Sequence, residues 1–155
     1  MKLNLQLSCY NGARYLPYLF ASLAKQTYRD WQVFVLDNAS DDENKKMIEE
    51  AVAKSGLPIQ LFRVEKNIGF AGAQNYLFEK TKDISDAIQL VNDDAILEPE
   101  FLEKCLAHLE KQPLCAAVTG KILRWDFDRR DEADGGRTQT VDSLGLALDW
   151  RGFVR

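Results

Sequence analysis

The sequence predicts a three-layer α/β/α domain with a mainly parallel central sheet, and three observations support this prediction. Short apolar runs of strand length alternate with longer amphipathic stretches over most of the 155 residues, as in βαβ units. Polar, turn-forming residues follow the apolar runs. The length suits one domain with its own core, so we expect a single domain over residues 1–155.

The first third of the chain is predicted to form a strand, a helix and a second strand. Leucines at 3, 5 and 7 alternate with polar residues, as in a strand with one apolar face. Asn11-Gly12 breaks that strand, and apolar residues at helical spacing then predict a helix over 15–23. The next strand covers 33–36 and ends at Asp37.

A polar helix and a third strand come next. Ser40 and Glu43 have the spacing of a capping box, which predicts that a helix opens there and continues to about Lys54. Gly56 ends that helix, and residues 59–64 have the pattern of the third strand.

The central part continues the alternation of strands and helices. Small residues over 67–72 form a loop that leads into a helix around 76–78. Residues 88–91 form a buried strand, which is followed by an acidic turn. A helix then starts at Pro99, because proline is well placed in a first helical turn.

The C-terminal part is predicted to be less regular. Two short strands cover 116–119 and 122–125, and the charged, glycine-containing segment 126–140 is the best candidate for a mobile loop. Residues 141–148 have the pattern of a strand, and Trp150-Arg151-Gly152 suggests a turn whose return strand is cut off. An exposed sheet edge there would favour a homo-oligomer.

The composition excludes several classes of protein. A net charge of −4 with scattered basic residues gives no electrostatic basis for binding nucleic acid. No apolar run approaches the roughly 20 residues of a membrane span, and the N-terminus lacks a signal-peptide core, so we expect a cytoplasmic protein. Cys9, Cys105 and Cys115 are odd in number and lack metal-ligand spacing, which predicts free thiols.

Polar residues at the ends of four predicted strands form the candidate functional site. The carboxyl ends of parallel strands meet at one edge of a sheet, where open α/β sheets bind ligands. We therefore expect four segments to converge, namely Ser8 to Asn11, Asp37 to Ser40, 67–72 and Asn92-Asp93-Asp94.

The adjacent carboxylates Asp93 and Asp94 have two possible explanations, and one of them is a metal site. They repel each other and lose hydration at a strand end, so a cation usually has to compensate them. Oxygen ligands suit Mg²⁺ or Mn²⁺, and such a metal commonly bridges carboxylates to substrate phosphates. The alternative is an ordinary Asx-rich turn between a strand and a helix.

The other strand ends offer groups for a nucleotide. Tyr10 has a flat face on which a base can stack, and Asp37 and Asn38 offer hydrogen-bonding groups to a base or a ribose. Gly69 and Gly72 allow the backbone to approach a phosphate near a helix N-terminus. The structural alternatives are a packing tyrosine and plain turns.

These segments, in this order, resemble the nucleotide-binding half of inverting family 2 glycosyltransferases of the GT-A fold, particularly the rhamnosyltransferase-like branch. The resemblance covers essentially the whole chain. The segments that match family motifs are Ser8-Cys9-Tyr10-Asn11-Gly12, Leu23 through Gln26 with Trp31, Val35 through Asp42, Asn67 through Asn75, and Asn92-Asp93-Asp94 at the DxD position.

The resemblance implies a role for each segment. The nucleoside, with uracil or thymine as its base, would lie against Ser8, Tyr10, Asn11, Asp37 and Asn38. The diphosphate and sugar would lie near Asn67, Gly69, Gly72 and Asn75. Asp94 would be the direct ligand of Mg²⁺ or Mn²⁺, and Asp93 would contact the donor sugar or ribose, or complete the metal shell through water.

Two positions depart from the family pattern. Asn38 stands where many members carry a second Asp, so the contacts with base or ribose would differ. Asn92 replaces the first Asp of DxD, which leaves Asp94 as the metal ligand.

The resemblance also implies an activity. Such enzymes transfer a sugar, here a hexosyl or rhamnosyl group from a dTDP- or UDP-sugar, to a saccharide or lipid-linked acceptor in polysaccharide biosynthesis. A lipid-linked acceptor would bring the protein to the inner face of the membrane. The general base in such enzymes is an Asp or Glu of the acceptor-binding half. Nothing in residues 1–155 matches it, so we expect no catalytic residue in this chain and a base C-terminal to residue 155.

Two alternatives remain open at this point. The chain would be a nucleotide-binding module that catalyses nothing by itself if the acceptor half is required for turnover. A sugar-phosphate nucleotidyltransferase shares the general architecture, but the residues after the first strand lack the glycine-rich signature of that class.

Overall fold

The computed structural model describes residues 1–143, which fall into two compact units. The first unit comprises Met1–Glu103, and the second begins at Lys104. The single domain over 1–155 stays a prediction. The expected strand and turn over 144–152 lie outside the described residues.

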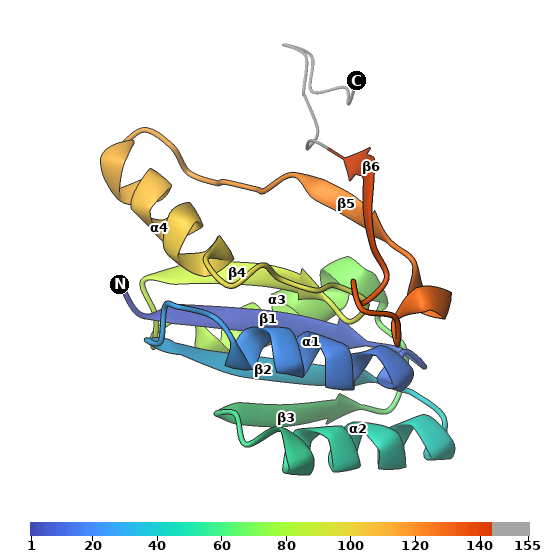
Figure 1. The fold of residues 1–155 in the computed structure, drawn as a ribbon. Coiled ribbons are helices and arrows are strands. Elements are labelled where there is room, and N and C mark those ends of the chain that lie inside the picture. The colour runs from blue at the N-terminus through green and yellow to red at the C-terminus, as the bar shows by residue number, and fades with distance from the viewer. Residues whose placement is uncertain (144–155) are drawn as a thin grey trace, which may run out of the picture. The chain divides into compact units, whose positions relative to one another are not determined.

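The first unit is a parallel sheet with helices on both faces, as the sequence predicts (Figure 1). The sheet order is β3-β2-β1-β4, and every neighbouring pair is parallel. The strands are β1 (Leu3–Cys9), β2 (Trp31–Asn38), β3 (Ile59–Val64) and β4 (Ala87–Asn92). The helices are α1 (Leu16–Ala24), preceded by the 3-10 turn η1 (Ala13–Tyr15), then α2 (Asp42–Ser55) and α3 (Gly69–Thr81).

The helices divide between the faces of the sheet. In Figure 1, α1 and α2 lie on the near face and α3 on the far face. Helix α3 packs Ala73 and Leu77 against Phe34 and Leu36 of β2. A fourth helix, α4 (Phe101–Lys111), begins in the first unit and continues into the second.

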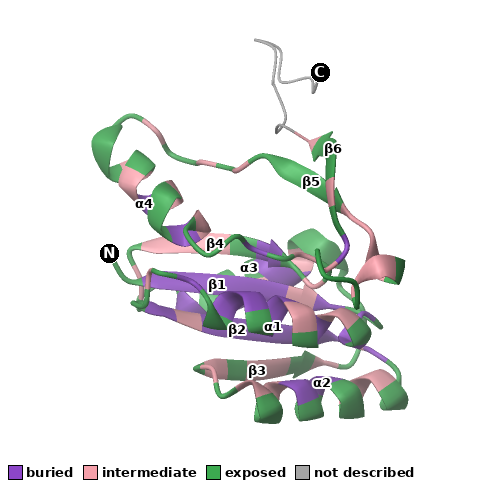
Figure 2. Cartoon of the chain, viewed as in Figure 1, coloured by how far each residue is buried: buried purple, intermediate pink, exposed green. Residues whose placement is uncertain are grey.

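The core is centred on β1 and β2, which are buried along nearly their whole length (Figure 2). This differs from the expected single apolar face of the first strand, because α3 also covers the polar side chains of β1. Gln6 Nε2 donates to Thr81 Oγ1 at 3.1 Å, and Asn4 Nδ2 donates to Thr81 O at 3.0 Å. A central parallel strand is buried on both faces, so its polar residues need internal partners.

The second unit contains an antiparallel pair, β5 (Ile122–Trp125) and β6 (Arg137–Ser143), joined through the 3-10 turn η2 (Phe127–Arg129). The predicted loop over 126–140 is therefore wrong for residues 137–140, which belong to β6, and its mobility stays a prediction. Arg129 Nη2 pairs with Glu132 at 2.7 Å and with Asp134 at 2.8 Å, and β6 begins inside the segment. Charge complementarity within the segment gives it local structure, which a count of polar residues does not reveal.

Two further predictions are corrected. Residues 116–119 form no strand, because an apolar run becomes a strand only with a pairing neighbour, and none of the described strands pairs with it. The helix after β2 is capped by Asp41, whose Oδ1 accepts from Asn44 N at 2.8 Å, and not by Ser40. Among the described residues, no helix combines the length and the apolar character needed to cross a membrane.

Candidate functional site

The four strand ends named in the sequence lie at one edge of the sheet, because all four strands are parallel. Ser8 is opposite Asn92 of β4, and Cys9 is opposite Asp37 of β2. The chain leaves β1 toward β2 on one side and returns to β4 on the other, so the topological switch point lies between β1 and β4. Open α/β sheets bind ligands at such a point.

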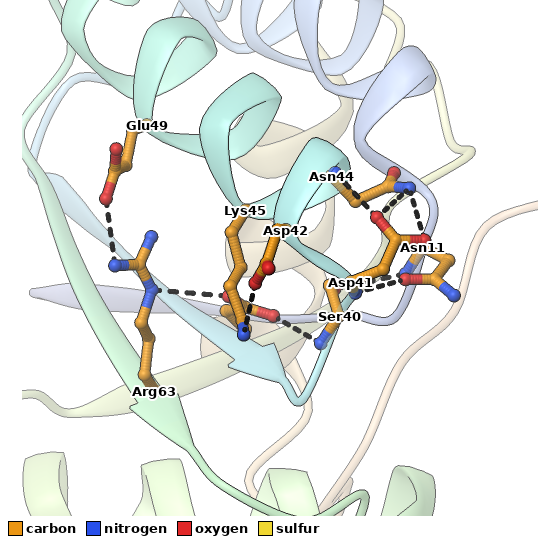
Figure 3. A network of polar contacts seen from close by, with 9 residues as sticks. Asn11, Ser40, Asp41, Asp42, Asn44, Lys45, Glu49 and Arg63 are labelled. Carbon is orange, nitrogen blue, oxygen red and sulfur yellow. Dashed lines mark hydrogen bonds and ion pairs between the residues drawn. The ribbon is translucent and has the colours of Figure 1, made fainter.

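The loop after β1 is tied to the turn after β2 (Figure 3). Asn11 N donates to Ser40 Oγ at 3.1 Å, and Asp41 N donates to Asn11 Oδ1 at 2.9 Å. Asn11 has a φ of 54°, a left-handed conformation that is uncommon outside glycine. Tyr10 is 54% exposed on this loop, so its ring is available for stacking.

Asp37 is a buried carboxylate with two internal partners. Its Oδ1 accepts from Ser40 N at 2.9 Å, and its Oδ2 accepts from Arg63 Nε at 3.2 Å (Figure 3). Arg63 Nη1 also lies 2.8 Å from Glu49 Oε1. Both oxygens of Asp37 are therefore oriented, and its charge is compensated.

Asn38 connects β2 to the loop before α3. Its Oδ1 accepts from Ile68 N at 3.0 Å, and its Nδ2 donates to Asn67 Oδ1 at 3.1 Å. The amide is buried, and these bonds require both a donor and an acceptor. A second aspartate at this position could not supply the donor, so the departure from the family pattern has a structural reason. A ligand contact by Asn38 stays a prediction.

The N-terminus of α3 opens at the same edge. The helix begins at Gly69, so Gly72 belongs to the first turn and not to the loop predicted from the sequence. Gly69 has a φ of 72°, and its N donates to Asn67 Oδ1 at 2.8 Å. Asn75 is exposed one turn further along. The N–H groups of a first turn and the positive end of the helix dipole favour an anion.

Asp93 and Asp94, the two carboxylates of the acidic turn, have different surroundings. Asp94 is exposed, whereas Asp93 is half-buried against Gly12, where a Cβ would lie 2.0 Å from Asp93 Oδ2. Desolvation raises the pKa of Asp93, and the charge of Asp94 adds to the rise. Burial, together with the charge of Asp93, raises the pKa of the Cys9 thiol to about 12. Asp94 is thus the carboxylate open to a cation.

The donor set suits a cation that is shared with a substrate. Over residues 1–143, no three carboxylate, imidazole or thiol side chains gather into a ready-made metal cage. Mg²⁺ and Mn²⁺ sites that use one or two carboxylates are commonly completed by substrate phosphates and water. An exposed Asp94 at the switch point fits this kind of site.

The supporting roles of two groups of residues were not predicted from the sequence. The role of Arg63 could not be predicted, because its partners lie on β2 and α2, which are distant in the sequence. Ser22 and Gln26 at the end of α1 hold the segment that follows the acidic turn. Gln26 Nε2 donates to Glu98 O at 2.8 Å, and Ser22 Oγ accepts from Leu97 N at 3.1 Å. The motif match over Leu23 through Gln26 was the available signal in the sequence.

Comparison with known proteins identifies relatives of the chain. The model of the glycosyl transferase family 2 matches residues 7–147. The O-antigen chain rhamnosyltransferase RfbN of Salmonella typhimurium is 29% identical over 124 residues, which are 79% of this chain and 38% of that protein. The putative glycosyltransferase EpsE of Bacillus subtilis is 27% identical over 130 residues, 83% of this chain and 46% of that protein.

Solved structures share the fold. Residues 1–349 of S. aureus TarS in complex with UDP-GlcNAc superpose with a TM-score of 0.61 at 20% identity, over 80% of this chain and 38% of that one. The mannosyltransferase PcManGT from Pyrobaculum calidifontis, in complex with GDP-Man and Mn²⁺, gives a TM-score of 0.62 at 20% identity. The match covers 79% of this chain and 36% of that one.

The chain spans less than half the length of these relatives. The family match nevertheless extends over most of the chain and includes all four strand ends of the site. The parallel sheet and its flanking helices agree with the GT-A fold of the neighbouring structures. The chain belongs to glycosyl transferase family 2.

Proposed function

We propose that this glycosyltransferase chain binds a nucleotide-diphosphate sugar, with dTDP or UDP as the nucleotide, together with Mg²⁺ or Mn²⁺. The bound hexosyl or rhamnosyl group would be transferred with inversion to a saccharide or lipid-linked acceptor. The observation that carries the proposal is the position of an exposed Tyr10 and an exposed Asp94 on loops that flank the switch point of the sheet.

The nucleoside would occupy the corner between the β1 and β2 ends. Tyr10 would stack on the base, and Ser8 and Asn11 would line the pocket. Asp37 and Asn38 would bind base or ribose, although the internal hydrogen bonds of Asn38 also give it a structural role.

The diphosphate would lie between α3 and the acidic turn. Asn67, Gly69 and Gly72 place the helix N-terminus at this edge, and Asn75 would contact the sugar. Asp94 would hold the metal, and Asp93 would contact the sugar or ribose. When bound, the metal would neutralise charge that develops on the leaving diphosphate.

The comparisons support the donor class. The TarS and PcManGT structures are complexes with UDP-GlcNAc and with GDP-Man and Mn²⁺. The rhamnosyltransferase among the relatives supports rhamnosyl transfer. We further propose that the general base lies C-terminal to residue 155 and that a lipid-linked acceptor brings the protein to the inner face of the membrane.

Calorimetric titration with UDP, dTDP and GDP, each with and without Mn²⁺, tests the proposal. We expect binding of UDP or dTDP that Mn²⁺ strengthens, and Asp94→Asn should abolish the strengthening while leaving metal-free binding in place. Asp83→Asn is the matched control, because Asp83 is also exposed but precedes β4 at the opposite edge of the sheet. Absence of binding by every nucleotide would refute the donor site.

Transfer is tested separately by release of UDP or dTDP from a sugar donor, with and without a saccharide acceptor. Release above background would show that the chain turns over by itself. Binding without release would agree with a base outside residues 1–155.

A further inference from the structure

We propose that Arg63 is a positioning residue of the nucleoside corner, which holds Asp37 and, through it, the loop that carries Tyr10. The inference rests on the proposed nucleotide function and adds a residue that lies on β3, outside the four strand-end segments. Figure 3 shows the chain of contacts that supports it.

Arg63 compensates a buried charge. It is opposite Asp37 in the β2–β3 register, so both side chains project from the same face of the sheet. The Asp37 side chain is 1% exposed, and Arg63 Nε lies 3.2 Å from its Oδ2. A buried carboxylate is strongly destabilising without a cationic partner, and Arg63 is the one that the described residues provide.

Glu49 of α2 fixes the direction of the guanidinium. Arg63 Nη1 lies 2.8 Å from Glu49 Oε1, while Nε faces Asp37. The two contacts use different edges of a planar, rigid group, so the position of Asp37 is defined in direction as well as distance. The hydrogen bond to Glu49 raises the pKa of Arg63, which keeps the residue charged.

Hydrogen bonds continue from Asp37 to the first loop. Asp37 Oδ1 accepts from Ser40 N at 2.9 Å, and Ser40 Oγ accepts from Asn11 N at 3.1 Å. Ala39 and Asn11, which flank these bonds, have φ values of 67° and 54°. Asn adopts this conformation more readily than other non-glycine residues, whereas an alanine stays in it only where its surroundings hold it.

Two separate corners of the site follow from this arrangement. Arg63, Asp37, Ser40 and Asn11 organise the nucleoside corner. The ion pairs of Arg63 are with Asp37 and Glu49, and neither belongs to the acidic turn. Loss of Arg63 should therefore weaken nucleotide binding and leave the strengthening by Mn²⁺ unchanged.

The test measures UDP and dTDP affinity, with and without Mn²⁺, for Arg63→Met and Arg63→Lys in the full chain. We expect Arg63→Met to weaken metal-free binding by about tenfold or more, which corresponds to the loss of one oriented charge partner. Arg63→Lys should recover part of the loss, because lysine keeps the charge but lacks the second edge that contacts Glu49. The ratio of affinities with and without Mn²⁺ should equal that of the unchanged protein.

Arg29→Met is the control, since Arg29 is an exposed arginine that donates to Ala24 O. Unchanged nucleotide affinity in folded Arg63→Met would overturn the inference. It would also be overturned if the ratio of affinities with and without Mn²⁺ fell as much as the metal-free affinity. If Arg63→Met does not fold, Arg63→Lys is judged by the same two criteria. Failure of the unchanged protein to bind any nucleotide would instead refute the proposed function.

Discussion

At the scale of single residues, the acidic turn shows how neighbouring identical side chains acquire different properties. Asp94 faces solvent, while Asp93 lies against the backbone of Gly12 and beside the Cys9 thiol. Burial raises the pKa of Asp93, whereas exposure leaves Asp94 free to share a cation with a phosphate. The absence of a side chain at position 12 makes this separation possible.

We predict that Gly12→Ala displaces the Asp93 carboxylate. The added Cβ would lie 2.0 Å from Asp93 Oδ2, so the variant should lose about 1–3 kcal/mol of unfolding free energy, as overpacked sites do. Urea unfolding of Gly12→Ala, Asp93→Ala and the double variant measures the coupling. Gly12→Ala should cost clearly less in the Asp93→Ala background, and an equal cost in both backgrounds would contradict the prediction.

The Cys9 thiol predicts a pH dependence of stability. Burial, the largest cause, raises its pKa from 9.0 to about 12. Below pH 9.0 the thiol is protonated in both the folded and the unfolded protein. Between pH 9.0 and about 12 only the unfolded chain releases the proton. Cys9 therefore loses its stabilising contribution as pH rises through that window. The unfolding free energy should fall more steeply there than in Cys9→Ala, and parallel curves would disprove the prediction.

At the scale of elements, the start of α2 depends on one side chain. Asp41 Oδ1 accepts from Asn44 N at 2.8 Å, and Ser40 is used instead to bind the first loop. The capping box predicted from Ser40 and Glu43 has the correct spacing, but the cap lies one residue later. Helix initiation and the organisation of the site thus use adjacent residues for different purposes.

Asp41→Ala is expected to lower the urea midpoint more than Glu43→Ala, because only Asp41 caps an otherwise unpaired N–H. The hydrogen bonds from Asn44 lower the pKa of Asp41 below its ordinary 3.8. Its contribution is therefore present above pH 3.8 and is lost as pH falls through the folded value. Chemical unfolding at neutral and acidic pH measures both effects. Equal urea midpoints for the two variants would contradict the assignment of Asp41 as the cap.

At the scale of the whole molecule, contacts between distant segments hold the acidic turn in place. Gln26 at the end of α1 binds the chain 72 residues later through Glu98 O, and its Oε1 accepts from Leu102 N at 3.2 Å. Thr27 N donates to Pro99 O at 2.8 Å in the same region. The segment between β4 and α4 is therefore anchored to the rest of the first unit.

Gln26→Leu should destabilise the protein by about 2–4 kcal/mol, since it leaves buried backbone groups without partners. Because that segment follows the acidic turn, the strengthening of nucleotide binding by Mn²⁺ should also decrease. Gln60→Leu, at an exposed position of β3, is the control and should change stability by less than about 0.5 kcal/mol. Stability of Gln26→Leu equal to that of the control would contradict the anchoring role.

The predictions that held were those carried by local pattern and by chain order. The third strand was predicted with its observed bounds, and the other strands of the sheet differ mainly by a few terminal residues. The edge at which the four polar segments meet followed from parallel pairing alone. The strand over 116–119 and the loop over 137–140 failed, because strand pairing between distant segments decides such regions.

The sequence by itself determined the α/β class, the family and the residues at the strand ends, because periodicity and motif order are properties of the chain. Only the tertiary structure decided how the members of each polar pair differ. Asp93 is half-buried against Gly12 while Asp94 is exposed, and Asp37 is oriented by Arg63 while Asn38 anchors a loop. The physical reason is that burial, charge compensation and hydrogen-bond direction depend on neighbours that are close in space but remote in sequence.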